Sequence, residues 1–282
     1  MTDLTLITRF LEAHPRLVVV TGAGISAASG IPTYRDAAGR WLRAQPIQHR
    51  EFVTDERQRK RYWARSISGW PAVRDARPNR AHIAFSELER QGRVELLITQ
   101  NVDRLHQRAG SRKVTDLHGR LDQVQCLGCA CRYSRESIQQ RLLGDNPHIQ
   151  PGARTTLPDG DADVACHLLD GLKVPGCKNC GGILKPDVVF FGDNVPSQTV
   201  ERCMAALERA DALLAAGSSL QVWSGFRFCK RAAELGRPLM IINPGQTRAD
   251  PLATVKLHAE CGPLLHDAAA ILQNRRGAAL PG

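Results

Sequence analysis

The sequence contains no long apolar run, and aromatic residues make up only 5% of its 282 residues. The missing run excludes a membrane-spanning helix, which needs about 20 consecutive apolar residues. Residues 1–14 also lack the basic start and apolar core that are typical of a signal peptide. We therefore expect a monomeric protein of the cytoplasm that makes no contact with membranes.

A concentrated basic surface is also missing, although the net charge is +10. The basic residues are scattered, and the densest run, at 57–65, is typical of a solvated helix face. Proteins that bind nucleic acid usually interleave basic and aromatic side chains, and aromatic residues are scarce here. We therefore do not expect nucleic acid as a partner, and a zinc ribbon that binds nucleic acid without catalysis is the weakest alternative.

Short apolar runs alternate with helical patterns along most of the chain. Runs bounded by glycine, proline or polar residues predict buried parallel strands at 17–20, 94–98, 188–191, 212–216 and 239–242. Apolar residues at helical spacing predict helices at 4–13, 81–91, 200–210, 225–235 and 263–273. This alternation predicts an α/β fold with a Rossmann-like, doubly wound parallel sheet.

Residues 126–180 interrupt that rhythm and contain four cysteines in two CxxC pairs. Four thiolates in two such pairs suit one tetrahedral zinc ion with no open position, so we expect a structural metal site. Either Cys131 or Cys166 could replace one ligand, but the paired spacing argues against it. Residues 143–163 predict a long surface loop. The expected zinc ligands are Cys126, Cys129, Cys177 and Cys180.

These patterns divide the chain into three parts. We expect a Rossmann-like, NAD-binding domain, the helical part of a smaller domain, and an inserted zinc-binding module of that smaller domain. The expected boundaries are 1–45, 78–120 and 186–282 for the first part, 46–77 for the second and 121–185 for the third.

A glycine loop directly follows the first predicted strand. Gly22, Gly24 and Ala27 fit the GxGxxG/A pattern, in which glycine lets the backbone approach a pyrophosphate. The acidic residue that holds the adenine ribose in dehydrogenases, about 20 positions later, is missing. The loop therefore predicts dinucleotide binding but argues against hydride transfer.

Several motifs occur together and in order. They are GAGISAASGIPTYR from Gly22 to Arg35, TQNVD from Thr99 to Asp103, LHG around His118, GSS at 217–219 and Asn243, with the CxxC pairs between them. This set resembles the sirtuin family from about residue 10 to about residue 270. The segments PIQH at 46–49, RYWAR at 61–65, KPDVVFFGD at 185–193 and GSSLQV at 217–222 are similar to a class II branch that contains the mitochondrial sirtuin-four type, in a bacterial version.

The resemblance implies NAD as co-substrate and names the residues that hold it. Ala23, Gly24 and Ser26 would meet the pyrophosphate, and Asp103 with the backbone of Val102 would hold the nicotinamide amide. Pro32, Tyr34 and Arg35 would belong to a loop that closes over NAD. The full implied set is Gly22, Ala23, Gly24, Ser26, Pro32, Tyr34, Arg35, Gln100, Asn101, Val102, Asp103, Gly217, Ser218, Ser219, Asn243 and Cys261.

The resemblance also implies a lysine deacylase with acyl-lysine proteins as partners. The acyl oxygen would displace nicotinamide, and His118 would then take a proton from a ribose hydroxyl, which attacks the acyl carbon. Asn101 would orient the ribose or a water molecule. The products would be free lysine, nicotinamide and O-acyl-ADP-ribose. The substrate backbone would add as a strand beside Val189, Phe190, Phe191 and Gly192.

Two questions remain open from the sequence. Transfer of ADP-ribose to a protein side chain is the alternative activity, because it too begins by breaking the nicotinamide bond. The second question is the acyl group. Tyr62 and Arg65 lie three positions apart in a helical pattern and could clamp an acidic acyl tail. In the other interpretation Tyr62 packs in the helical part and Arg65 is a surface charge.

Overall fold

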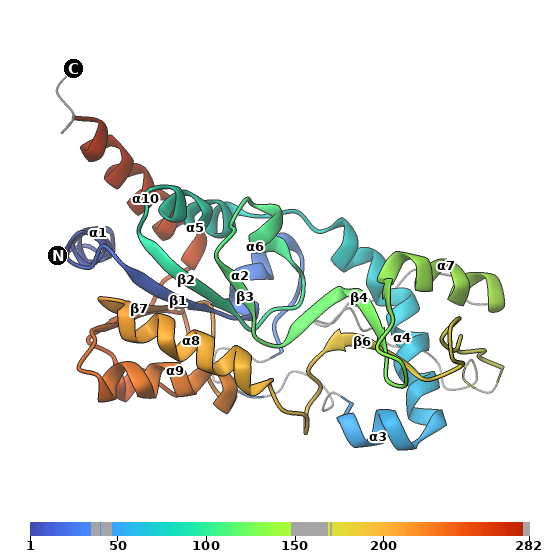
Figure 1. Ribbon diagram of the computed structural model, residues 1–282. Coiled ribbons are helices and arrows are strands. Elements are labelled where there is room, and N and C mark those ends of the chain that lie inside the picture. The colour runs from blue at the N-terminus through green and yellow to red at the C-terminus, as the bar shows by residue number, and fades with distance from the viewer. Residues whose placement is uncertain (35–39, 41–46, 148–168, 170, 279–282) are drawn as a thin grey trace.

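The computed structural model describes residues 1–34, 40, 47–147, 169 and 171–278. A six-stranded sheet forms its larger part, with every neighbouring pair parallel (Figure 1). The strand order is β3-β2-β1-β7-β8-β9. The strands are β1 (Leu17–Thr21), β2 (Val94–Thr99), β3 (Val114–Asp116), β7 (Ala212–Ala216), β8 (Leu239–Ile242) and β9 (Val255–Leu257).

Helices cover both faces of this sheet (Figure 1). One layer contains α1 (Asp3–Ala13), α5 (Arg80–Arg90) and α10 (Cys261–Ala278), and the other contains α8 (Ser197–Arg209) and α9 (Trp223–Glu234). Successive side chains of β1 alternate between the layers: Leu17 and Val19 pack with the first, Val18 and Val20 with the second. A strand buried on both faces needs apolar residues throughout, which is why the sequence reads as a continuous run.

A second, antiparallel sheet lies beside the first (Figure 1). Its strands are β4 (Gly119–Cys126), β5 (Arg132–Ser134) and β6 (Leu184–Val188), in the order β5-β4-β6. The helices α3 (His49–Thr54), α4 (Glu56–Asp75) and α7 (Arg135–Asp145) pack with it around one apolar cluster. The helical and cysteine-containing segments therefore share one small core.

A buried arginine joins these helices. The guanidinium carbon of Arg135 lies 5.4 Å from the ring centre of Trp63 and 5.3 Å from that of Trp70, both on α4. It also donates to the backbone oxygen of Ser66 at 3.0 Å. Arg135 is fully buried, and the two rings and this carbonyl compensate its lost hydration in part, since Nε and Nη1 have no hydrogen-bond partner among the described residues.

The prediction of a parallel strand at 188–191 was wrong. Val188 instead ends β6, which is antiparallel to β4, and residues 189–191 leave the small sheet. These residues are apolar for another reason: Val188 packs with Trp70, and Phe190 packs with Phe52. Burial against helices produces the same apolar run as burial in a sheet.

Other elements complete or correct the expected order. The three-residue strands β3 and β9 were not predicted, and α7 occupies 143–145, the start of the expected loop. Arg35, Cys166 and most of that loop lie outside the described residues. Short helices are α2 (Ala23–Ser26), η1 (Ala27–Ser29), α6 (Leu105–Arg108) and η3 (Asp250–Leu252). Within the described ranges, no helix combines the length and the apolar character that crossing a membrane requires.

Candidate active site

A cavity of about 590 Å³ opens at the carboxyl ends of the parallel strands. Its centre lies where the chain order reverses, between β1 and β7, because β2 and β3 lie on one side of β1 while β8 and β9 follow β7 on the other. Ligands of doubly wound sheets bind at such a crevice. The loops after β1 and β7 both line it, at Gly22 and Gly217.

The two loops touch so closely that glycine is required. The backbone N–H of Gly24 donates to the oxygen of Gly217 at 2.8 Å. A Cβ atom on Gly24 would lie 2.8 Å from that oxygen, and one on Gly22 would lie 2.8 Å from the Cβ of Ser218. The glycine pattern therefore joins β1 to β7 and leaves backbone atoms, without side chains, at the cavity wall.

Most of the predicted site residues line this cavity. Phe190, Gly192, Tyr62, Arg65 and Pro32 are not part of the lining, and Arg35 lies outside the described residues. The predicted residues in the lining are Gly22, Ala23, Gly24, Ser26, Tyr34, Gln100, Asn101, Val102, Asp103, His118, Val189, Phe191, Gly217, Ser218, Ser219, Asn243 and Cys261.

A hydrogen-bonded chain joins two of these side chains, which follow β2, to a third in α2. Asn101 Nδ2 donates to Ser26 Oγ at 3.0 Å, and Ser26 Oγ donates to Asp103 Oδ2 at 2.6 Å. The other carboxyl oxygen accepts from the N–H of Leu105 at 2.9 Å. Burial raises the pKa of Asp103, and the donation from Ser26 opposes that shift. The carboxyl group is thus held in one orientation at the cavity wall.

Gln100 ties the same strand end to β7. Its Nε2 donates to Ser218 Oγ at 2.8 Å and to the backbone oxygen of Thr21 at 3.2 Å. A Cβ on Gly225 would lie 2.5 Å from Gln100 Oε1, so α9 packs tightly against this side chain. Residues from β1, β2, β7 and α9 therefore meet around one amide.

His118 follows β3 and is bonded at both ring nitrogens. Nδ1 lies 2.9 Å from the oxygen of Gln100, and Nε2 lies 2.7 Å from Ser224 Oγ. A carbonyl can only accept, so Nδ1 carries the hydrogen and Nε2 is the basic nitrogen. Burial lowers the pKa of His118 to about 4, and the charge of Arg227 adds to the shift, while the bond to Gln100 opposes it. The ring is neutral at physiological pH and can accept a proton.

The far end of the cavity contains Asn243 and Cys261. Asn243 Nδ2 donates to the oxygen of Gly245 at 2.9 Å, and Cys261 Sγ donates to the oxygen of Ile242 at 3.3 Å. Burial raises the pKa of the Cys261 thiol to about 12. This thiol therefore stays protonated and acts as a small apolar wall rather than as a nucleophile.

The segment after β6 forms the cavity edge beside His118. The N–H of Val189 donates to the oxygen of His118 at 2.8 Å, and the oxygen of Phe191 accepts from the N–H of His49 at 2.8 Å. Phe190 points into the small core, where its ring centre lies 5.3 Å from that of Tyr62. Tyr62 is buried in this aromatic cluster and Arg65 is half-buried, so the expected clamp remains a prediction.

The four predicted metal ligands come together at the end of the small sheet. The sulfur atoms of Cys126, Cys129, Cys177 and Cys180 all lie within 4.8 Å of one another. Cys126 Sγ and Cys180 Sγ are 3.4 Å apart, and Cys129 Sγ and Cys177 Sγ are 3.6 Å apart. Zinc–sulfur bonds of about 2.3 Å in a tetrahedron place sulfur atoms roughly 3.8 Å apart, so this set fits a zinc ion.

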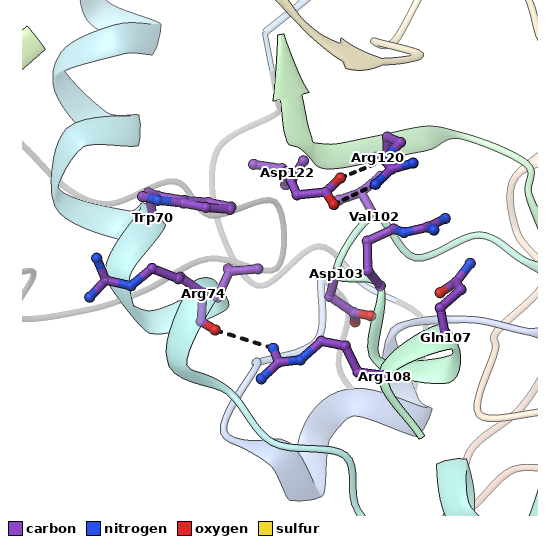
Figure 2. Close-up of a pocket in the computed structure, with 11 residues that line it drawn as sticks. Trp70, Arg74, Val102, Asp103, Gln107, Arg108, Arg120 and Asp122 are labelled. Atoms are coloured by element: carbon purple, nitrogen blue, oxygen red, sulfur yellow. Dashed lines mark hydrogen bonds and ion pairs between the residues drawn. The ribbon is translucent and has the colours of Figure 1, made fainter. Parts of the chain in front are cut away.

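A second cavity, of about 410 Å³, lies between α4, α6 and the start of β4 (Figure 2). Trp70, Val102 and Leu121 form its apolar part. Four arginines also line it, and three of them have carboxylate partners: Arg74 pairs with Asp75, Arg104 pairs with Asp116, and Arg120 pairs with Asp122. The four are Arg74, Arg104, Arg108 and Arg120.

Two residues of the site escaped the sequence interpretation. Ser224 contacts the basic nitrogen of His118, and Asn79 Nδ2 donates to the oxygen of Ile25 at 2.8 Å, which fixes the glycine loop. Asn79 precedes a helical pattern, and that position is typical of a helix cap. Nothing in the sequence around Ser224 indicates its partner, because His118 lies 106 positions away.

A model of the Sir2 family matches residues 22–224. An NAD-dependent protein deacetylase of Xanthomonas campestris pv. campestris is 52% identical over 256 residues, which cover 91% of this chain and 87% of that protein. An NAD-dependent protein deacetylase of Bordetella bronchiseptica is 50% identical over 268 residues, 94% of this chain and 97% of that protein.

Solved structures agree with this similarity. A Sir2 homologue variant in complex with ADP-ribose aligns with a TM-score of 0.77 at 32% identity, covering 98% of this chain and 99% of the other. A complex of Sir2 with a p53 peptide and NAD⁺ aligns with a TM-score of 0.75 at 28% identity, covering 99% of this chain and 100% of the other.

Proposed function

The chain belongs to the Sir2 family, and we propose that it is an NAD-dependent protein lysine deacylase that transfers the acyl group to ADP-ribose and releases nicotinamide. One observation carries the proposal. A neutral histidine, with its basic Nε2 identified by its partners, lines a single cavity together with the glycine loop and the segment that follows β6.

We infer that NAD occupies this cavity, which the residues below support. Backbone atoms of Gly22 and Gly24 form the part suited to a pyrophosphate, because glycine lets a phosphate approach the main chain closely. We assign Asp103 to the carboxamide of nicotinamide and Asn243 to the adenine ribose. When bound, NAD supplies the ADP-ribosyl acceptor and nicotinamide as the leaving group.

The protein's own residues then divide the work. Asn101 orients a ribose hydroxyl, because its amide is fixed by Ser26. His118 Nε2 takes the proton of a ribose hydroxyl, while the Nδ1 bond to Gln100 holds the ring in the required tautomer. We assign the segment at Val189 and Phe191, which lines the cavity beside His118, to the binding of an extended peptide that brings the acyl-lysine to the histidine.

We assign a structural zinc ion to the four cysteines. Four thiolates leave no open coordination position, so the metal would hold the small sheet and would not touch the substrate. The thiolates also fit a reducing compartment, which supports action in the cytoplasm.

We propose that the protein is a monomer, and light scattering would measure its mass in solution.

The first experiment combines the purified protein with NAD and an acetyl-lysine peptide. Mass spectrometry should show loss of the acetyl group, free nicotinamide and O-acetyl-ADP-ribose in equal amounts. The variant His118→Tyr should form no acetyl-ADP-ribose. Nicotinamide release with a stable ADP-ribose adduct on protein, and no loss of acyl from any peptide, would instead favour the ADP-ribosyltransferase alternative.

The second cavity supports longer or acidic acyl groups as additional substrates. It shares Val102 and Asp103 with the NAD cavity (Figure 2). Arg108 in its wall donates to the backbone oxygen of Arg74 at 3.2 Å, and its charge acts on the nearby carboxylates of Asp75 and Asp103 without a hydrogen bond to either among the described residues. A carboxylate at the end of an acyl chain would complete its hydrogen bonding.

A panel of acetyl-, succinyl-, methylglutaryl- and lipoyl-lysine peptides tests this proposal. If the cavity holds the acidic tail, Arg108→Gln should lower the rate for succinyl relative to acetyl peptides by roughly tenfold. The variant Arg65→Gln should have that effect instead if Tyr62 and Arg65 form the clamp. A wild-type preference for neutral acyl chains would reject both.

A further inference from the structure

An exposed tryptophan stands at the start of α9, beside the NAD cavity. Trp223 leaves 48% of its surface exposed, and no other phenylalanine, tyrosine or tryptophan within the described ranges is exposed. The residues directly before it, from Ser219 to Val222, all line the cavity. A single exposed ring needs no explanation, but this one has charged neighbours that the protein core does not require.

Two cations and a second ring surround this tryptophan. The guanidinium carbon of Arg248 lies 4.3 Å from the ring centre of Phe226 and 5.7 Å from that of Trp223. Lys230 Nζ lies 5.8 Å from the Trp223 ring centre, and the two ring centres are 5.9 Å apart. Cations at such distances are attracted by the ring faces. We call these four residues, Trp223, Phe226, Lys230 and Arg248, the aromatic–basic patch.

Arg248 is anchored to the loop that lines the cavity. Its backbone N–H donates to the oxygen of Ser219 at 2.9 Å, and its Nη1 donates to the oxygen of Gln221 at 3.2 Å. Both acceptors belong to the loop between β7 and α9, whose residues line the NAD cavity. The rings and this loop hold the guanidinium in place before a ligand arrives, so binding orders little more of the protein.

The charge of Arg248 is not matched inside the protein. Arg248 forms no ion pair with any described carboxylate, whereas Lys230 pairs with Glu234 at 3.9 Å. Among the described residues the guanidinium makes one hydrogen bond, through Nη1, and it has five N–H donors. The remaining donors fit a carboxylate, and the adjacent indole ring fits the short apolar stem that carries it.

We propose that the aromatic–basic patch binds an acidic side chain of the substrate protein, a few positions from the acyl-lysine, and so selects which lysines are deacylated. The inference rests on the proposed deacylase function. Val189 and Phe191, assigned to the peptide, line the same cavity as Gln221 and Val222. An extended peptide advances about 3.3 Å per residue, so a few residues beyond the acyl-lysine are enough to cross the loop that carries the patch.

Fluorescence polarisation of labelled acetyl-lysine peptides, without NAD, measures this preference apart from any turnover. One set of peptides carries a single glutamate at each position from four before to four after the acetyl-lysine, and the matched set carries glutamine. For the wild type at low salt we expect glutamate at one or two positions to tighten binding about threefold to fivefold. The gain should shrink at high salt, because the contact is exposed.

Three variants locate the contact. Arg248→Gln should bring the glutamate and glutamine peptides to the same affinity. Trp223→Ala changes an exposed residue, so it should fold normally, and it should reduce the gain because the guanidinium loses one of its rings. Arg112→Gln removes the same charge at an exposed position before β3, at the opposite end of the strands, and should keep the full preference.

The outcomes that would overturn the proposal are equally definite. A wild type without any position-dependent preference rejects it, as does a preference that survives in both Arg248→Gln and Trp223→Ala. An equal loss in Arg112→Gln would show general attraction by the net positive charge instead of a contact at the patch.

The same peptides with NAD keep this inference separate from the proposed function. The values of kcat/KM for deacylation should follow the binding ratios. Absent turnover of every peptide with the binding preference intact would reject only the deacylase function, whereas turnover without a preference would reject only the role of the patch.

Discussion

The NAD cavity and the cysteine cluster are built in opposite ways. The cavity forms at the carboxyl ends of the six-stranded sheet. The loops that follow the strands make its walls, and backbone atoms of Gly22, Gly24 and Gly217 shape it. The small sheet has three strands and depends on four side chains gathered at its end. Substitutions in the cavity should lower the rate of deacylation while the fold persists. Substitutions in the cysteine cluster should disrupt the small sheet and lower the rate of deacylation as a consequence.

Removing the metal should produce the largest effect. With Cys177→Ser, or with a strong zinc chelator, we expect the small sheet to lose its packing and deacylation to fall to background, because structural zinc supplies folding free energy directly. Hydrogen exchange should show lost protection in β4 and α7 but retained protection in β1 and β7.

The matched control for this experiment is Cys131→Ser, a cysteine beside the cluster but outside it. It should keep one zinc ion per chain by elemental analysis. If Cys131→Ser lost zinc as fully as Cys177→Ser did, the assigned ligand set would be wrong.

The variant His118→Ala should separate chemistry from fold. We expect kcat for deacylation to fall by roughly 10²–10⁴, the range for a general base, while the melting temperature and zinc content stay close to those of the wild type. Nicotinamide exchange should continue. The control is His266→Ala, an exposed histidine on α10. A large loss of stability in His118→Ala would contradict the division between the two regions.

Mild acid should destabilise the part of the protein built on the six-stranded sheet, because His82 and His106 are both fully or almost fully buried there. Burial lowers the pKa of His82 to about 4, and burial together with the charge of His82 lowers the pKa of His106 well below its usual value. The unfolded chain takes up these protons near pH 6.5 but the folded chain does not. The free energy of unfolding should therefore fall as the pH drops below about 6.5, by up to about 1.4 kcal/mol per pH unit for each histidine. The fall due to His82 ends near pH 4, where the folded protein also takes up that proton.

Urea unfolding at pH 7.0, 6.0 and 5.5 measures this loss. In the wild type the N–H of Asn79 donates to His82 Nδ1 at 3.2 Å. The variant His82→Gln keeps a hydrogen-bond acceptor at this position, but glutamine does not titrate. The free energy of unfolding should fall less steeply with acid in this variant. An identical slope would show that His82 takes up no proton on unfolding.

A pair of glycine substitutions gives the smallest expected effect. Gly24→Ala must push the β1 and β7 loops apart, so we expect NAD affinity to fall about tenfold by calorimetry, with a modest loss of stability. Gly144→Ala places the same methyl group on α7, where no atom lies within 4 Å, and should be neutral or up to about 1 kcal/mol stabilising. Equal effects of the two variants would remove the special role of the glycine loop.

Much of the six-stranded sheet and its helices could be predicted from the sequence. Strands β1, β7 and β8 are buried throughout, so each one is a short apolar run bounded by breakers, and β2 keeps most of that pattern although Glu95 and Leu96 are only half-buried. The edge strands β3 and β9 have three residues each and carry too little pattern to be recognised. The run at 188–191 misled the prediction because apolar residues that face helices look the same as those in a sheet.

The sequence by itself determined the motifs: the glycine loop, the cysteine pairs, and the resemblance that points to His118, with bacterial relatives as expected. The narrower resemblance to the sirtuin-four branch stays a prediction. Only the tertiary structure decided which atom of His118 is basic, that Tyr62 is buried in an aromatic cluster, and that Ser224 meets the ring. The reason is distance along the chain: local patterns record propensity and burial, whereas a contact between residues 106 positions apart exists only once β2, β4 and α9 have packed together.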